Sequence, residues 1–566
     1  MINFKGNPFF LSDEDIAWVK DTLANMTVEE KMGQLFCLHG DSDDFNVLEQ
    51  IVDTYKPGAM MYRPGDSGKI YDIHQFLQKK SRIPMLLAAN LEAGGDGIGN
   101  DGTFYGRQIQ IAASDNVENA YRLGVVAARE GSSVGCNWAF APVVDIDMNY
   151  ANPITNVRTY GSNPQRVLDM ASAYMKGCQE NDVAVSIKHF PGDGVDDRDQ
   201  HLVASVNSLS VEEWDATFGL VYKGMIERGA KTVMAGHILQ PAYTRMFSPD
   251  IKDEEIKPAS LSKELLQGLL RHKLGFNGLI VTDATEMVGF AAAGRRADLL
   301  PGAIAAGCDM ILFTRNMEED YQFMKTGIDN GIVSQDRLDE AVSRILATKA
   351  SLKLHSKARE NKLMPPKEGL NILKCAEHVQ WAEELSDQSI TLVKDTQHIL
   401  PIDKTAYKKV IVFVLGDLVS ASGKPPVSRL FIQSLEEEGF QVDTFDAQIH
   451  SDLFRKKMIA EIREQYDLVL YFANIKTASN QTTVRINWLP PMGLDTPWFV
   501  HEIPTIFVSV ANPYHLQDVP MIKTYINAYT ANEFNPKKIV EKMVGKSEFK
   551  GKNPIDPFCS YWDTKL

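Results

Sequence analysis

Eight short apolar runs in the first two-thirds of the chain, with helix-like stretches between them, predict an α/β fold in which a (β/α)8 TIM barrel precedes a smaller αβα sandwich domain. Most of these runs are nearly continuous in hydrophobic residues, as is typical of parallel strands buried on both faces. An open doubly wound sheet is the main alternative, and eight strand–helix repeats favour the barrel. The runs are residues 32–38, 58–62, 84–90, 137–145, 183–190, 232–238, 278–284 and 309–314.

The helical stretches and a linker signal predict the domain boundaries. Residues 117–134 and 164–181 are examples of the helices between strands, and residues 336–354 form the helix that closes the barrel region. The next residues are charged and contain a Pro-Pro pair, which is typical of a linker. We therefore expect the barrel domain over residues 1–354 and a linker over residues 355–375.

A second α/β region follows the linker, and we expect its domain over residues 376–566. Its apolar runs alternate with helical stretches such as residues 429–439, which predicts a small sheet sandwiched by helices. Its sequence has neither a GxGxxG fingerprint nor a P-loop, so nucleotide binding has no support. The runs are residues 409–417, 440–445, 467–475, 504–510 and 524–529.

The composition excludes several classes of partner. The formal net charge is −15, which argues against binding to nucleic acid or to an anionic membrane. The six cysteines show no CxxC spacing, and buried free thiols suit a reducing compartment. The sequence has no run of ~18 apolar residues and no visible signal peptide. We therefore expect a cytoplasmic protein without a membrane span.

Polar side chains stand at the ends of five of the predicted strands. Because the carboxyl ends of parallel barrel strands meet at one face, residues there carry the chemistry of barrel enzymes. A single polar strand end only marks the start of a loop, but five of them, including two histidines and two aspartates, predict a shared site. They are Asn90, Asp145, His189, His237 and Asp283.

The segment KHFPGDGVDDRDQH, residues 188–201, concentrates ionisable side chains directly after a predicted buried strand. Asp199 and His201 are two residues apart, so in an extended loop their side chains face the same way. Asp199 can then accept a hydrogen bond from His201, which fixes the tautomer of the histidine and raises its basicity. A histidine oriented by a carboxylate is a recurring general acid/base unit.

Two other interpretations of the 188–201 segment compete with an acid/base pair. A calcium loop counted from Asp193 would need Gly at its sixth position and an acid at its twelfth, where Arg198 and Ala204 stand. The metal-dependent barrel hydrolases begin with an HxH pair, and the first strand run offers only His39. A solvated charged loop is the remaining alternative, since runs of charge are usually solvated.

Asp283 ends the apolar run GLIVTDA, and a carboxylate there would point into the mouth of the barrel. It could instead cap the following helix, but Thr285 can serve equally well as a cap. A rigid carboxylate opposite a loop that carries an acid/base group is the arrangement that a retaining glycosidase requires. One group attacks the anomeric carbon, and the other protonates the leaving oxygen.

These segments resemble glycoside hydrolase family 3, and within it the β-N-acetylglucosaminidase branch. The signature of that branch, KHFPG(H/D)G followed by D-x-H, is similar to residues 188–194 with Asp199 and His201. Further segments that resemble the family are residues 141–164, which match at Arg158, residues 258–287 around the nucleophile, and residues 390–402 at the start of an αβα second domain.

The resemblance implies a role for each candidate residue. Asp283 is the expected nucleophile of a glycosyl-enzyme intermediate, and His201 is the expected general acid/base with Asp199 as its partner. The residues expected to hold the sugar are Arg158, Lys188 and His189, with His237 as another histidine of the pocket. The family implies no metal and no organic cofactor.

The chain departs from the family pattern at two places. Many relatives read IDQEGG after the third strand, with an Asp that binds the sugar, whereas AANLEAGGDG puts Asn90 or Glu92 there. We take Asn90 as the candidate for this contact. Relatives also often have His where Asp193 stands. Both changes concern the surroundings of the site and leave Asp283 and His201 in place.

The expected activity is that of a retaining exo-β-N-acetylhexosaminidase, which releases terminal N-acetylglucosamine from an oligosaccharide or glycoside. One alternative is a phosphorylase, with inorganic phosphate as acceptor, because a neutral histidine does not repel phosphate as a carboxylate would. A β-glucosidase is another alternative, which the D-x-H motif disfavours. From a different class, a sugar-binding protein without turnover would not need both Asp283 and His201.

Overall fold

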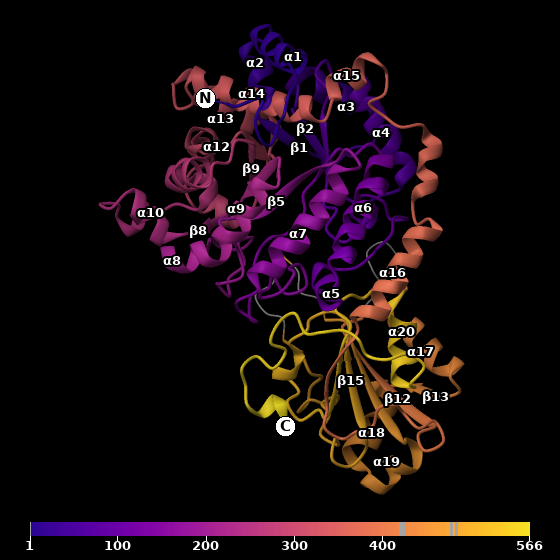
Figure 1. Cartoon of the computed structure of the whole chain (residues 1–566). Coiled ribbons are helices and arrows are strands. Elements are labelled where there is room, and N and C mark those ends of the chain that lie inside the picture. The colour runs from indigo at the N-terminus through magenta and orange to yellow at the C-terminus, as the bar shows by residue number, and fades with distance from the viewer. Residues whose placement is uncertain (1, 418–424, 476–478, 481–484) are drawn as a thin grey trace. The chain divides into compact units, whose positions relative to one another are not determined.

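The computed structural model describes residues 2–417, 425–475, 479–480 and 485–566. The chain forms two compact units, which we describe separately (Figure 1). The first unit comprises residues 1–105, 120–155 and 163–378, and the second comprises residues 106–119, 156–162 and 379–566.

The first unit is a closed barrel of parallel strands, which confirms the predicted fold class. In the described part of the chain its strand order is β1-β10-β9-β7-β5-β4-β3-β2, and it closes through the pairing of β1 with β10. Each of the eight predicted runs supplies one barrel strand. The strands are β1 (Phe36–Gly40), β2 (Ala59–Tyr62), β3 (Leu86–Ala89), β4 (Trp138–Ala139), β5 (Ala184–Phe190), β7 (Thr232–Ala235), β9 (Leu279–Ala284) and β10 (Met310–Leu312).

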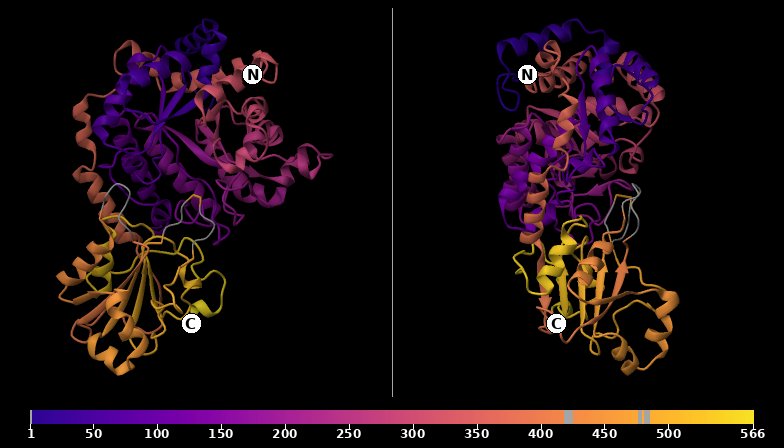
Figure 2. Two further views of the ribbon diagram at one scale, coloured as in Figure 1. Left: turned by 180° about the vertical axis from the view of Figure 1, so that it is seen from behind. Right: turned by 90° about the vertical axis from the view of Figure 1, so that its right-hand side faces the viewer.

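Helices surround this barrel, as both views in Figure 2 show. The helical stretches expected at residues 117–134, 164–181 and 336–354 are α6 (Val117–Ser133), α7 (Pro164–Gln179) and α14 (Gln335–Ser351). The other helices of this unit are α1 (Asp13–Ala24), α2 (Val28–Gln34), α3 (Phe45–Tyr55), α4 (Ser67–Lys80), α8 (Val211–Trp214), α9 (Leu220–Glu227), α10 (Pro241–Phe247), α11 (Val288–Ala291), α12 (Arg296–Ala306), α13 (Met317–Asp329) and α15 (Leu354–Arg359).

Two short strands outside the barrel join the loops that follow β5 and β7. Strand β6 (Ser205–Val206) pairs in parallel with β8 (Ile238–Leu239). Asn207 extends this pairing, because its backbone N–H donates to the carbonyl of Leu239 at 2.8 Å. The 188–201 segment, which runs from β5 toward β6, is therefore fixed at both ends.

The predicted linker packs against the first unit. The hydroxyl of Tyr71 donates to the carbonyl of Pro365 at 2.6 Å, and the Lys367 ammonium lies 2.6 Å from the Asp72 carboxylate. The buried Glu130 carboxylate accepts from the backbone N–H of Lys374 at 3.0 Å. The first unit consequently extends through residue 378, whereas the predicted barrel domain ended at residue 354.

The second unit is built around a six-stranded sheet with the order β11-β16-β15-β14-β12-β13. Strand β11 is antiparallel to β16, and the other neighbouring strands are parallel. The five predicted runs all contain strands. The strands are β11 (Thr391–Asp395), β12 (Lys409–Leu415), β13 (Gln441–Thr444), β14 (Leu468–Ala473), β15 (Thr505–Ser509) and β16 (Thr524–Asn527).

Helices cover both faces of this sheet, so the unit is an αβα sandwich as predicted (Figure 2). One apolar core includes residues of α17 (Ser428–Glu437) and α20 (Asn535–Met543), and the other includes residues of α18 (Ala447–Lys456) and α19 (Ile459–Gln465). The remaining helices are α5 (Gln108–Ala113) and α16 (Ala376–Ser389). Within the described residues, no helix is long and apolar enough to span a membrane. The cytoplasmic location stays a prediction.

Candidate active site

The candidate residues of the first unit lie at the carboxyl ends of the barrel strands. Because all eight strands are parallel, these ends share one face of the barrel. Asp283 is on β9, Lys188 and His189 are on β5, Asn90 and His237 follow β3 and β7, and Asp199 and His201 lie between β5 and β6.

Asp283 presents a buried carboxylate with one oxygen available for chemistry. Its Oδ1 accepts from the backbone N–H of Ala284 at 2.8 Å. Its Oδ2 has no hydrogen-bond partner among the described residues. Burial by itself would raise the pKa of Asp283, but interactions with the neighbouring imidazoles of His189, His237 and His201 and with the backbone N–H of Ala284 outweigh burial and lower this pKa. Asp283 is therefore held as a carboxylate, the form that can attack an electrophilic carbon.

His189 faces Asp283 and is held from behind by Asp145. The Nδ1 atom of His189 lies 2.7 Å from Asp145 Oδ2, and its backbone N–H donates to Asp145 Oδ1 at 3.0 Å. The Nε2 atom lies 3.9 Å from Asp283 Oδ2. Because a carboxylate on Nδ1 favours a proton there, the pair fixes the tautomer of His189 and orients its imidazole toward Asp283.

Asp145 reaches this position because its segment leaves the barrel sheet early. Strand β4 ends at Ala139, and Pro142 has no N–H with which to continue a ladder. The chain nevertheless stays beside β5, since the backbone N–H of Val144 donates to the carbonyl of Lys188 at 2.8 Å. Asp145 was predicted only as a polar strand end, without a role in the site.

His201 and Asp199 form the pair that their spacing predicted. The Nδ1 atom of His201 lies 2.6 Å from Asp199 Oδ1, and the same oxygen accepts from the backbone N–H of His201 at 2.8 Å. The carboxylate is buried, whereas 16% of the imidazole side chain is exposed. The ring nitrogen Nδ1 is therefore committed to Asp199, and Nε2 is left for proton exchange with a ligand.

His237 lies close to Asp283 but uses both ring nitrogens within the protein. Its Nε2 is 2.9 Å from the carbonyl oxygen of Ala284, and its Nδ1 is 2.9 Å from the hydroxyl of Ser260. Since a carbonyl only accepts, Nε2 carries the proton and Nδ1 accepts from Ser260. Burial lowers the pKa of His237, which favours this neutral form. This geometry suits a residue that supports the strand end carrying Asp283.

Lys188 is buried and is held by the residues that follow β3. Its ammonium lies 2.8 Å from Glu92 Oε1 and 3.5 Å from Asn90 Oδ1. Glu92 is buried, whereas Asn90 is exposed. Of the two residues that could replace the family's aspartate, Glu92 makes the ion pair, and the exposed Asn90 makes only the longer contact to Lys188.

Arg158 lies in the segment 156–162, which belongs to the second unit. Its side chain is half-buried there. Its expected contact with the sugar stays a prediction.

Two residues of the 188–201 segment that sequence reasoning gave no role are buried inside it. Gln200 is fully buried, and Asp193 is 2% exposed. The sequence signal for Asp193 was its departure from the histidine that relatives often have there. Gln200 gave no signal, because the identity of a residue between two catalytic candidates does not show which way its side chain points.

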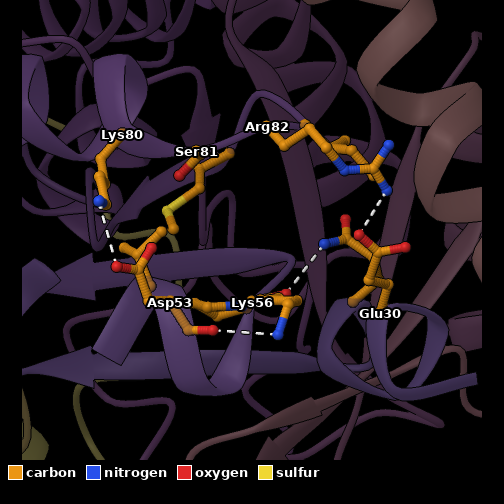
Figure 3. Close-up of a pocket in the computed structure, with 11 residues that line it drawn as sticks. Glu30, Asp53, Lys56, Lys80, Ser81 and Arg82 are labelled. Atoms are coloured by element: carbon orange, nitrogen blue, oxygen red, sulfur yellow. Dashed lines mark hydrogen bonds and ion pairs between the residues drawn. The ribbon is translucent and has the colours of Figure 1, made fainter. Parts of the chain in front are cut away.

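A separate pocket of about 160 Å³ lies at the opposite, amino ends of β1, β2 and β3. Figure 3 shows that its charged groups pair with neighbours: Lys80 with Asp53 and Arg82 with Glu30, at 3.1 and 2.7 Å. The pocket thus lies at the opposite end of the barrel strands from Asp283. Among the described residues, no cluster of three or more His, Cys, Asp or Glu side chains is suited to hold a metal ion.

Comparison with known proteins identifies the family. Residues 27–348, more than half of the chain, match the model described as "Glycosyl hydrolase family 3 N terminal domain". The chain is 43% identical over 569 residues to a "Beta-N-acetylglucosaminidase/beta-glucosidase" of Cellulomonas fimi, with all of both chains covered.

Solved structures agree with the fold. The structure of "Beta-glucoside phosphorylase BglX bound to 2FGlc" superposes with a TM-score of 0.93 and 46% identity, covering 99% of each chain. A family 3 β-N-acetylglucosaminidase from Paenibacillus sp. shares the fold with a TM-score of 0.78 at 23% identity, covering 95% of this chain and 100% of that one. The resemblance found in the sequence is confirmed: the chain belongs to glycosyl hydrolase family 3 and is an enzyme.

Proposed function

We propose that the enzyme releases terminal β-linked N-acetylglucosamine or glucose from glycosides and oligosaccharides by a retaining, two-step mechanism. The observation that carries this proposal is the Asp283 carboxylate, which is held ionised and has one oxygen without a protein hydrogen bond among the described residues. The His201–Asp199 pair supplies the proton transfer that such a mechanism needs.

In the first step, an Asp283 oxygen attacks the anomeric carbon and forms an ester bond to it. The bond between this carbon and the glycosidic oxygen breaks, and its electron pair stays on that oxygen. The proton on His201 Nε2 passes to the departing oxygen. Asp199 stabilises the imidazolium before this transfer and keeps its ring oriented.

In the second step, His201 acts as the base. Its Nε2 takes a proton from a water molecule, whose oxygen attacks the anomeric carbon. The ester bond to Asp283 breaks, and the carboxylate is restored. Two displacements at one carbon give a product with the configuration of the substrate.

The sugar is proposed from the 43% identical relative, whose name gives two activities, β-N-acetylglucosaminidase and β-glucosidase. The D-x-H motif at residues 199–201 favoured N-acetylglucosamine in the sequence analysis. Lys188, Arg158 and Asn90 are the proposed donors and acceptors for the sugar hydroxyls, since charged donors make the stronger hydrogen bonds.

A fluorinated sugar tests the nucleophile. A 2-fluoro or 5-fluoro glycosyl fluoride should slow the second step and leave a sugar on the peptide that contains Asp283, which mass spectrometry of a digest would detect. Asp283→Ala should abolish both the label and turnover of a chromogenic glycoside. A label on another residue, or full turnover by Asp283→Ala, would refute the assignment.

Phosphorolysis is a second candidate, in which inorganic phosphate replaces water in the second step. Two observations favour it. The proposed acid/base is a histidine, which is neutral after it gives up its proton and so does not repel phosphate. The 46% identical structure is described as a β-glucoside phosphorylase. Incubation of glycoside with and without phosphate decides between them: a sugar 1-phosphate supports phosphorolysis, and free sugar at all phosphate concentrations supports hydrolysis.

A further inference from the structure

Gln200 stands between the two members of the acid/base pair and points its side chain into the protein. It is fully buried, although its neighbour His201 is partly exposed. Its Nε2 donates to Asp193 Oδ2 at 3.2 Å, and its Oε1 accepts from the backbone N–H of His237 at 2.9 Å. The amide therefore links the 188–201 segment to the loop after β7.

Asp193 is itself anchored on the scaffold that holds His189. Its backbone N–H donates to Asp145 Oδ1 at 2.8 Å. Its Oδ1 accepts from Asn152 Nδ2 at 2.9 Å and from the backbone N–H of Gly194 at 2.7 Å. With these donors on one oxygen, the other oxygen of Asp193 is left to accept from Gln200. Asp193 is thus a fixed point to which Gln200 is tied.

The backbone around Gln200 also contacts the segment that follows Asp283. The carbonyl of His201 accepts from the backbone N–H of Val288 at 3.0 Å. A Cβ added to Gly289 would lie 2.4 Å from the carbonyl oxygen of Gln200, so only glycine permits this approach. The position of His201 is consequently fixed by the hydrogen bond at its own carbonyl and by the close approach of Gly289 to the carbonyl of Gln200.

We propose that Asp193 and Gln200 are positioning residues that aim His201 at the glycosidic oxygen. This inference rests on the proposed function of His201 as acid/base. The Gln200 amide has a defined orientation, because Asp193 needs a donor and the His237 backbone needs an acceptor. A shift of about 1 Å in a catalytic group can cost ~10²-fold in rate, so this orientation affects proton transfer.

Exchanging the two side chains tests the proposal. Asp193→Asn places its amide nitrogen against Gln200 Nε2, so that two donors face each other. Gln200→Glu places two carboxylates face to face. The double variant Asp193→Asn/Gln200→Glu restores a donor opposite an acceptor and keeps an acceptor for the His237 backbone N–H. All three variants preserve the volume of the side chains.

The readout is kcat/KM for aryl β-glycosides, which reports the first step. The 2,4-dinitrophenolate group of a dinitrophenyl glycoside departs without a proton, whereas the 4-methoxyphenol group of a methoxyphenyl glycoside needs one. Each single variant should lose ~10- to 100-fold on the methoxyphenyl substrate and stay within about threefold on the dinitrophenyl substrate. The double variant should recover to within about fivefold of wild type on both. Asp197→Asn, an exposed change in the same segment, should match wild type.

Two further controls make each result decisive. Thermal unfolding of each variant checks the fold, and if one single variant does not fold, the other compared with the double variant gives the same test. Equal losses on both substrates, unchanged single variants, or a double variant worse than either single variant would overturn the proposal. His201→Ala must itself show the dependence on leaving group; if it does not, the proposed function fails rather than the positioning role.

Discussion

At the scale of single residues, the two proposed reacting groups differ in how they are held. Asp283 lies on a barrel strand and is 5% exposed, whereas His201 lies in a loop and its orientation depends on side-chain contacts. The strand end supplies the rigidity that a nucleophile needs. The imidazole needs a partner to define its tautomer, and Asp199 provides it at 2.6 Å.

Asp199→Asn should therefore impair proton transfer without disturbing the nucleophile. The amide keeps the shape of the side chain but removes the charge that stabilises the imidazolium and can present a donor to Nδ1. We expect kcat/KM for a glycoside with a poor leaving group to fall ~10²- to 10⁴-fold. Labelling of Asp283 by an activated fluoro sugar should persist, as mass spectrometry would show. Loss of the label would mean that Asp199 also maintains the strand end.

At the scale of elements, helix α14 contributes buried cations to the base of the barrel. Asp309, which precedes β10 and is fully buried, lies 2.7 Å from the guanidinium groups of Arg337 on α14 and of Arg271. Arg344 of α14 lies 3.6 Å away. The same carboxylate accepts from the backbone N–H of Ile280 on β9 at 2.9 Å. The strand that carries Asp283 is thus anchored at its other end by this network.

Asp309→Asn should destabilise the protein by ~3–5 kcal/mol, because it leaves buried guanidinium groups without their carboxylate. Burial alone would raise the pKa of Asp309, but the three arginines lower it below its ordinary value of 3.8. The carboxylate therefore stabilises the fold above pH 3.8 and loses this effect as the pH falls through the lower folded pKa. Urea unfolding should show the difference from wild type shrinking only in strong acid. The exposed Asp329→Asn should change little.

Lys349, on the same helix, is a buried charge whose removal should increase the free energy of unfolding, in contrast to the removal of the Asp309 charge. It is fully buried, its ammonium lies 2.6 Å from Gln34 Oε1, and burial lowers its pKa to about 7. Between pH 7 and its ordinary value of 10.5, the unfolded chain binds a proton that the folded chain does not, so stability rises with pH.

Lys349→Met removes this cost, so its free energy of unfolding at pH 7 should exceed that of wild type by ~1–3 kcal/mol. The gain should shrink toward pH 10. Urea unfolding at several pH values measures it, with the exposed Lys325→Met as control. A destabilised Lys349→Met would show that the bond to Gln34 outweighs the burial of the ammonium.

The elements that sequence reasoning predicted are those whose pattern is local. Strands β5 and β9 are buried along almost their whole length, and that burial is visible as an apolar run. The Asp199–His201 pair could be predicted because the two residues are only two positions apart. The structure joins them in a turn rather than in the expected extended loop, since the backbone N–H of Leu202 donates to the carbonyl of Asp199 at 2.9 Å. The hydrogen bonds of Gln200 with Asp193 and with His237 could not be predicted. The first depends on the turn between residues 193 and 200, and the second on a loop 37 residues away in the sequence.

At the scale of the whole molecule, the chain enters the second unit before it completes the first. Residues 106–119 and 156–162 belong to the second unit, although the sequence assigns both to the barrel domain. Their local pattern does not differ from that of a barrel helix and its loops. Gln110 shows the attachment: its Nε2 donates to Ser389 Oγ at 3.1 Å and to Asn535 Oδ1 at 3.0 Å.

This connectivity predicts that the second unit is not stable as a simple C-terminal piece. A fragment of residues 379–566 lacks Gln110, whose amide donates to the buried Ser389 and Asn535 in the full chain. A buried polar group left without its partner costs ~1–3 kcal/mol, which is a large fraction of the stability of a domain. The fragment should unfold at a clearly lower urea concentration than the sandwich unit in the full chain, as near-UV circular dichroism would report. Addition of a peptide of residues 106–119 should raise that midpoint, and the same peptide with Gln110 changed to Ala should raise it less. A fragment as stable as the full-length unit would show that the inserted segments contribute little to its stability.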